Sequence, residues 1–170
     1  MAAAQALERS RRVFSGTPFL RRLNKLARMA HDVQESTKAE GLAGLVKQEE
    51  KDEKILVFTE YADTLDYLRD EILGDDFGPV ARISGSMSME ERQEEEERFA
   101  GDSCRIMVAT DAAGEGLNLQ FCHLMVNYDL PWNPNRMEQR IGRLHRYGQD
   151  REVRVYNIQV VNTREGVILT

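Results

Sequence analysis

The sequence predicts an α/β fold, a single open sheet of parallel strands with helices on both faces. Short and nearly continuous apolar runs, typical of strands covered on both sides, recur along the chain. Between them lie segments whose apolar residues have helical spacing. Strands that alternate with helices form right-handed βαβ units, and therefore a parallel sheet. With 170 residues, 41% hydrophobic and 31% charged, the chain suits one globular domain.

Five strands are expected from the apolar runs, at residues 55–59, 80–84, 105–110, 123–128 and 153–160. The first connection carries one apolar stripe at helical spacing, made of Tyr61, Leu65, Leu68 and Ile72. Ser88 followed by Glu91 is a capping-box signature, and it predicts a helix that reaches about Phe99. Four consecutive glutamates, at 94–97, lie in this helix, and we expect them on a solvated face.

A further helix is expected to start at Asn133 and Pro134, an N-cap residue followed by a proline in the first turn. At about 100° per residue, a helix continued through residue 146 has two distinct sides. One quadrant holds Gln139, Gly142, Arg143 and Arg146, and the opposite side holds Met137, Ile141 and Leu144. The pattern predicts three apolar residues in the core and two outward guanidiniums, which suit the oxygens of a transferred phosphoryl group. The alternative is an ordinary amphipathic helix with solvated arginines.

Three parts are expected along the chain. Residues 1–16 are expected to be poorly ordered or foreign to the natural protein. Residues 17–54 form a helical lead-in and a charged connector, and residues 55–170 form the main lobe, which we expect to be truncated at its C-terminal end. The apolar sides of the lead-in are Leu20, Leu23 and Leu26, followed by Leu42, Leu45 and Val46.

Composition narrows the class of protein. No apolar run reaches the ~18 residues of a membrane span, and no secretory signal is present, so we expect the cytoplasm, or the nucleus of a eukaryote. Cys104 and Cys122 lack metal-ligand spacing and are expected to be free core thiols, and no metal site is expected. The net charge of −6 does not exclude nucleic acid, because residues 1–30 carry +6 and residues 136–154 hold six arginines against three acids.

The third strand ends in a short segment of small residues that includes Gly114 and Gly116. Glycines at such a position allow backbone N–H groups to approach a phosphate, although an ordinary tight turn is the alternative. Ligands of open α/β sheets bind beyond the carboxyl ends of the strands. Because the arginine-bearing helix follows the next strand, we expect it at the same edge as the glycine segment.

Four segments together resemble a known family. Residues 55–58, residues 83–86 with Arg92, residues 110–120, and Gln139 to Arg146 resemble motifs IV, IVa, V and VI of the superfamily 2 helicases, in that order. Residues 127–134 and 143–149 resemble the Swi/Snf-type branch, most closely the bacterial RNA-polymerase-associated ATPase and its archaeal and bacterial relatives. The resemblance extends from about residue 37 to residue 168.

The resemblance implies a RecA-like C-terminal lobe and assigns roles to particular residues. It implies that Arg143 and Arg146 are arginine fingers for ATP. It places further residues near the nucleotide, namely Gly114, Gly116, Asn118, Gln139 and Gly142. It places others on the nucleic-acid track, namely Ser84, Gly85, Thr110, Asp111 and Trp132, although a partly buried packing role is the alternative for the tryptophan. Glu115 departs from the common Swi/Snf pattern, which has glycine there.

The sequence has no GxxxxGK[ST] phosphate loop and no acidic metal box after a strand. The resemblance therefore implies that ATP and Mg²⁺ are held mainly by a separate N-terminal RecA-like lobe of the same protein, and that this chain alone is inactive. We expect the C-terminal motor lobe of an ATP-dependent helicase or translocase, an ATP hydrolase when joined to that lobe. Double-stranded DNA is the expected nucleic acid, and RNA polymerase or another DNA-bound protein is a further expected partner.

Two alternatives stay open. One is a non-catalytic RecA-like module that docks on nucleic acid or polymerase, in keeping with the missing phosphate loop. The other is an RNA helicase of the DEAD-box type, which shares motifs V and VI. Residues 132–134 and 147–149 favour the duplex-DNA translocase branch over it.

Overall fold

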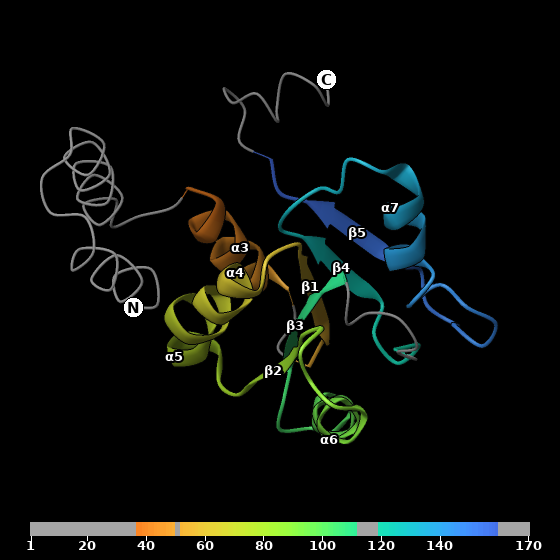
Figure 1. Ribbon diagram of the computed structural model, residues 1–170, viewed down its shortest axis with the longest axis horizontal. Coiled ribbons are helices and arrows are strands. Elements are labelled where there is room, and N and C mark those ends of the chain that lie inside the picture. The colour runs from red at the N-terminus through yellow and green to blue at the C-terminus, as the bar shows by residue number, and fades with distance from the viewer. Residues whose placement is uncertain (1–36, 50–51, 112–118, 160–170) are drawn as a thin grey trace, which may run out of the picture. The chain divides into compact units, whose positions relative to one another are not determined.

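The computed structural model describes residues 37–49, 52–111 and 119–159. They contain one five-stranded sheet in which every neighbouring pair is parallel, in the order β2-β3-β1-β4-β5 (Figure 1). The strands are β1 (Ile55–Thr59), β2 (Val80–Ile83), β3 (Ile106–Thr110), β4 (Leu124–Asn127) and β5 (Arg154–Asn157). The predicted fold class is confirmed. The last strand is shorter than predicted, because its partner β4 ends at Asn127 and offers no further residues to pair with.

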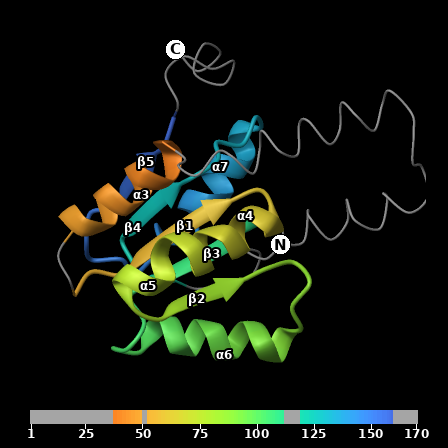
Figure 2. The same cartoon turned by 90° about the vertical axis from the view of Figure 1, so that its left-hand side faces the viewer.

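The helices cover both faces of this sheet (Figures 1 and 2). They are α3 (Thr37–Gln48), α4 (Ala62–Tyr67), a π-helical segment (Leu68–Leu73), α5 (Gly74–Phe77), α6 (Met89–Ala100) and α7 (Pro134–Ile141). On one face, Leu42 of α3 and Leu65 of α4 pack against Val57 of β1. On the other, Phe99 of α6 and Leu144 pack against Phe58. Val57 and Phe58, which are adjacent in β1, are therefore buried on opposite faces of the sheet. This explains the continuous apolar sequence of the strand.

The capping box predicted for α6 is confirmed. Ser88 Oγ accepts a hydrogen bond from the Glu91 N–H at 3.2 Å, and the Glu91 carboxylate accepts one from the Ser88 N–H at 2.7 Å. The expectation of a purely solvated acidic run is wrong at Glu95, whose carboxylate accepts the backbone N–H of Arg82 at 2.9 Å. Because β2 is an edge strand, that N–H has no neighbouring strand to bond to, and the glutamate replaces one.

Both cysteines are free and buried, as predicted. Burial raises the pKa of the Cys104 thiol, and it raises the pKa of Cys122 to about 12. Within the described part of the chain, no helix is both long and apolar enough to cross a bilayer.

Because all five strands are parallel, their carboxyl ends share one edge of the sheet. Glu60, Ser84, Asp111 and Tyr128 each directly follow a strand at this edge. The predicted nucleic-acid residues Ser84, Thr110 and Asp111 are therefore on the same side of the molecule.

Candidate functional site

A buried arginine lies at the centre of the carboxyl edge. The side chain of Arg140 is only 3% exposed and contacts Asp111 through both arms of its guanidinium, Nε to Oδ1 at 2.5 Å and Nη2 to Oδ2 at 2.9 Å. Its Nη1 donates to Asn127 Oδ1 at 2.8 Å and to the carbonyl of Asp129 at 2.7 Å. The guanidinium carbon lies 5.2 Å from the ring centroid of Phe58. One side chain therefore joins α7 to the ends of β1, β3 and β4.

Asp129 extends this network toward β1 and α3. Its carboxylate accepts a hydrogen bond from Thr59 Oγ1 at 2.6 Å and lies 3.7 Å from Lys38 Nζ. Lys38 also donates to the carbonyl of Tyr128 at 3.3 Å. Thr59 is completely buried, so its hydroxyl depends on this carboxylate. These hydrogen bonds and ion pairs form one connected, largely buried network, which fixes α7 relative to the strands.

α7 begins where predicted but ends earlier. Asn133 Oδ1 accepts the N–H of Asn135 at 3.0 Å, and Pro134 occupies the first turn. The helix ends at Ile141, so the predicted continuation through residue 146 is wrong. The N–H groups of Arg143 and Leu144 donate to carbonyls three residues back rather than four, each at 3.0 Å. Gln139, Gly142, Arg143 and Arg146 therefore do not share one helical quadrant.

Residues 142–148, here named the arginine turn, carry the two predicted arginine fingers. Arg146 is exposed, and its Nε donates to the carbonyl of Gly142 at 2.9 Å. Arg143 is half-buried. Leu144 is completely buried in the core, with Ile141 packed against the same cluster, so the predicted apolar side is confirmed for these two residues. Met137 is half-buried, with its sulfur 3.3 Å from Asn127 Nδ2.

Two glutamines hold the end of the arginine turn against the start of the segment that leads into β4. Gln149 Nε2 donates to the carbonyls of Gln120 at 2.8 Å, Cys122 at 3.1 Å and Leu144 at 3.4 Å. Gln120 Nε2 donates in return to the carbonyl of Tyr147 at 3.1 Å. Gly148, between Tyr147 and Gln149 in the chain, has a φ of 100°, a left-handed conformation in which a side chain would be strained. These contacts explain why the chain leaves the helical path.

The structure places the predicted nucleic-acid residues as follows. Thr110 is 5% exposed, and its hydroxyl is buried without a hydrogen-bond partner in the described structure. Asp111 has its carboxylate engaged by Arg140. Ser84 Oγ lies 3.0 Å from Ser86 Oγ, and the carbonyl of Gly85 accepts from Arg92 Nη2 at 3.2 Å.

Trp132 is 73% exposed, so the alternative of a partly buried packing residue is wrong. Gln139 is also exposed, on the last turn of α7. Gly114, Gly116 and Asn118 lie outside the described residues. The nucleotide and nucleic-acid roles of all these residues stay predictions.

Sequence reasoning missed the residue that organises this edge. Arg140 stands with Met137, Ile141 and Leu144 at positions i, i+3, i+4 and i+7, which is the spacing of a buried helical stripe. An arginine in such a stripe must have a buried partner, because an isolated charge in a core is very costly. That signal could have identified Arg140 as an internal ion-pair residue, although it would not have named Asp111.

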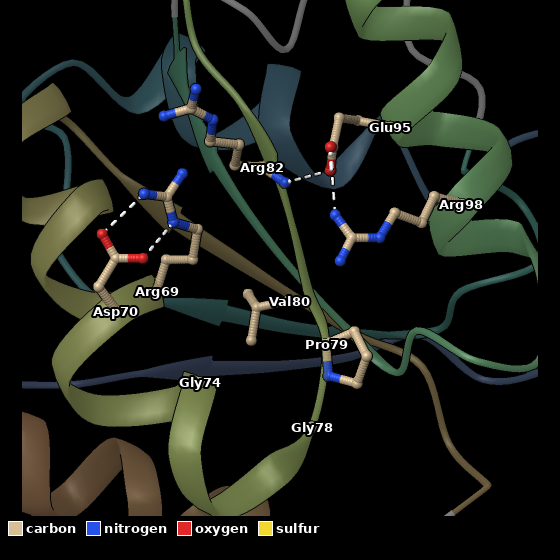
Figure 3. Close-up of a pocket in the computed structure, with 9 residues that line it drawn as sticks. All are labelled: Arg69, Asp70, Gly74, Gly78, Pro79, Val80, Arg82, Glu95 and Arg98. Carbon is tan, nitrogen blue, oxygen red and sulfur yellow. Dashed lines mark hydrogen bonds and ion pairs between the residues drawn. The ribbon is translucent and has the colours of Figure 1, made fainter.

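A separate pocket of about 500 Å³ lies beside the edge strand β2 (Figure 3). Three arginines line it, but each has a carboxylate within 3.3 Å: Asp70 for Arg69, Asp66 for Arg82 and Glu95 for Arg98. These matched charges leave no excess of positive charge to select a phosphate. This pocket is not at the predicted site.

The exposed donor of the arginine turn suits phosphate oxygens better than a metal ion. Arg146 offers an exposed, permanently charged guanidinium, which matches the geometry of a phosphate group. No group of three His, Cys, Asp or Glu side chains that could hold a metal ion occurs within the residues that the structure describes. Of the two cofactors expected from the sequence, the described residues therefore fit the phosphates of ATP, and they offer no cage for Mg²⁺.

Comparisons with known proteins agree with this geometry. Residues 37–148 match the family described as helicase conserved C-terminal domain. The chain is 41% identical over 139 residues to YqhH of Bacillus subtilis, described as an ATP-dependent helicase, and the match covers 82% of this chain and 24% of YqhH. It is 33% identical over 121 residues to the RNA polymerase-associated protein RapA of Yersinia enterocolitica, covering 70% of this chain and 12% of RapA.

A solved structure of the C-terminal part of the Fun30 ATPase domain superposes with a TM-score of 0.74 at 28% identity, covering 81% of this chain and 45% of that one. The chain spans about a quarter or less of the length of the curated relatives named above. The matched family, these relatives and the parallel sheet all agree on one assignment. This chain belongs to the helicase conserved C-terminal domains and is the C-terminal lobe of a superfamily 2 helicase of the Swi/Snf type.

Proposed function

We propose that this chain is the C-terminal motor lobe of an ATP-dependent nucleic-acid translocase, in which Arg143 and Arg146 act on the phosphates of ATP. The observation that carries the proposal is the arginine turn itself. It presents the exposed guanidinium of Arg146 from a segment that follows Arg140, whose own guanidinium contacts Asp111 at the carboxyl edge. Permanently charged guanidiniums stabilise the charge that develops in phosphoryl transfer.

The remaining part of the active site would come from the N-terminal RecA-like lobe of the same protein. The chain has no phosphate loop, and its described residues offer no cage for Mg²⁺. ATP and Mg²⁺ would therefore be held mainly by that other lobe, with Gln139 and Gly142 near the nucleotide on this side. We expect the isolated chain to hydrolyse ATP no faster than background.

Double-stranded DNA is the proposed nucleic acid, and Ser84, Gly85, Thr110, Asp111 and Trp132 the proposed track. The exposed indole of Trp132 supports it, because a track needs side chains that are accessible to the nucleic acid. RapA is described as RNA polymerase-associated, which supports a DNA-bound protein as a further partner. Such an enzyme would work in the cytoplasm of a prokaryote or the nucleus of a eukaryote.

The decisive experiment replaces Arg146 by alanine in the protein that carries both lobes. Loss of an arginine finger lowers turnover by roughly 10³–10⁵ in general, and we expect an effect of this order in ATP turnover with an unchanged melting temperature. Arg151→Ala is the matched control, because Arg151 is also exposed but pairs with Glu53, which precedes β1 at the opposite edge. Wild-type turnover in the Arg146→Ala enzyme would refute the proposed role.

The rival function is a non-catalytic docking module, which the absent phosphate loop favours. The two functions differ in what the whole protein does. A translocase hydrolyses ATP faster when duplex DNA is added, whereas a docking module binds its partner without nucleotide turnover. Duplex RNA in place of DNA, in the same assay, distinguishes the DEAD-box alternative from the translocase.

A further inference from the structure

We infer that Arg140 and Gln149 are positioning residues that fasten the arginine turn at both of its ends. Arg140 lies two residues before the first residue of the turn, and Gln149 directly follows the last. Their partners, Asp111 and Gln120, lie at the two ends of the segment that connects β3 to β4. The inference rests on the proposed function, since it assigns how the two fingers are held.

The first fastening is an ion pair inside the protein. Arg140 is 3% exposed, and Asp111 17% exposed, and the carboxylate receives both arms of the guanidinium. Such a forked pair restricts direction as well as distance, unlike a pair made by a lysine. Asn127 and the Asp129 carbonyl take the remaining arm, so each of the three guanidinium nitrogens has an acceptor.

The second fastening consists of neutral hydrogen bonds to the backbone. The amide nitrogen of Gln149 faces three carbonyl oxygens. Two of them belong to Gln120 and Cys122, in the segment that leads into β4. The Gln120 side chain bonds back to the carbonyl of Tyr147, within the arginine turn. Gly148 supplies the left-handed backbone that this closure requires.

The two sets of contacts, those of Arg140 and those of Gln149, act at different points of the arginine turn. Leu144 anchors its middle in the core by burial, which fixes depth but leaves direction to the polar contacts. Arg140 fixes the direction in which the turn leaves α7, and Gln149 fixes its exit. A displacement of Asp111 or Gln120 would therefore be passed on to the finger residues. Since Asp111 belongs to the proposed nucleic-acid track, the fastenings would couple nucleic-acid binding to the placement of Arg143 and Arg146.

The test uses isosteric or charge-preserving changes in the two-lobed protein. Gln149→Glu keeps the shape but places one carboxylate oxygen against three carbonyls, and Arg140→Lys keeps the charge but loses the fork. The matched controls are Gln93→Glu, on the exposed side of α6, and Arg151→Lys, at the opposite edge. ATP turnover is measured with and without duplex DNA, together with KM for ATP and the melting temperature.

Small misplacements of catalytic groups cost up to about 10²-fold in rate, so we expect DNA-stimulated kcat to fall roughly 10- to 100-fold in both variants. KM for ATP should stay within about threefold of wild type, because the fingers act mainly in the transition state. Basal turnover should fall less than stimulated turnover. Both controls should behave as wild type.

Wild-type stimulated kcat in both variants, in a protein that Arg146→Ala inactivates, would overturn the inference and leave the proposed function intact. A fall in kcat that merely follows a lowered melting temperature, and disappears when the assay is cooled, would also overturn it. If Arg146→Ala itself retains wild-type turnover, the proposed function fails instead. Should Gln149→Glu not fold, Arg140→Lys decides by the same criteria.

Discussion

At the carboxyl edge of the sheet, Arg140 is 3% exposed and donates four hydrogen bonds, whereas at the opposite edge the side chain of Arg151 is 55% exposed and pairs with Glu53. Glu53 also lies 3.4 Å from His123 Nδ1, in front of β4. Arg154, the first residue of β5, pairs there with Glu49 at 3.1 Å. Each edge has arginine–carboxylate pairs, but only at the carboxyl edge is the arginine itself buried.

The difference indicates a difference in role. Ion pairs in contact with water contribute little to stability, because solvent screens them and side-chain entropy opposes them. A buried pair, in contrast, makes each partner depend on the other, since an unpaired charge inside the protein is very unfavourable. The opposite edge, where the strands begin, is here called the amino edge. We expect it to tolerate substitution of its arginines, and the carboxyl edge, where the proposed active site lies, to resist it.

The largest expected effect is that of Arg140→Met on the stability of the chain. The substitution removes the guanidinium that pairs with Asp111 and the donor to Asn127 Oδ1, so the free energy of unfolding should fall by about 3–5 kcal/mol. Urea denaturation followed by circular dichroism measures it. Adding Asp111→Asn should recover part of the loss, because the carboxylate charge is gone. A loss below about 1 kcal/mol would show that the Arg140–Asp111 pair contributes no more than a solvent-exposed ion pair.

The matched change at the amino edge is Arg151→Met. We expect it to lower the free energy of unfolding by less than about 1 kcal/mol, because the guanidinium is half in solvent. Denaturation at low and high salt is the measurement, and the small difference from wild type should shrink as salt is added. A cost comparable to that of Arg140→Met would remove the distinction between the two edges.

The smallest effect is confined to acidic pH and sharpens the account of the amino edge. Burial lowers the pKa of His123 below its ordinary 6.5, although nearby Glu53 opposes this. The folded protein therefore binds this proton less readily than the unfolded chain, and stability should decline as the pH falls below 6.5. The Glu53 pKa is lowered too, chiefly by its hydrogen bond from Arg151, so its contribution is lost only below 4.5.

Comparing wild type with His123→Gln tests this assignment. Unfolding free energies of the two proteins should be measured between about pH 7 and about pH 5, the range in which a histidine of lowered pKa titrates. The variant should show a flatter dependence on pH than wild type. Identical slopes would mean that another group governs the acid sensitivity.

The strands and the two capped helices could be predicted because their signals are local. β1 was predicted to the residue, and α6 and α7 start at their predicted caps. The end of α7 could not be predicted in this way. From residue 142 onward the helical pattern competes with the hydrogen bonds of Gln149, whose acceptors Gln120 and Cys122 are more than 25 residues away in the chain.

The candidate site shows the same limit. Sequence identified Arg146 as outward-facing, and its side chain is exposed, but the shared helical face with Arg143 does not exist. The same pattern gave no reason to choose Asp111 as the partner of Arg140, because the two lie 29 residues apart and meet only when β3 and α7 reach one edge.

The sequence by itself determined the alternation of strands and helices and the parallel sheet. These follow from apolar periodicity and capping, which act over a few neighbouring residues. Only the tertiary structure decided that Arg140 points inward, that α7 stops at Ile141, and that Gln149 closes the arginine turn. Each of these depends on a polar partner brought close by folding, and a buried polar group takes whatever partner the packed chain provides.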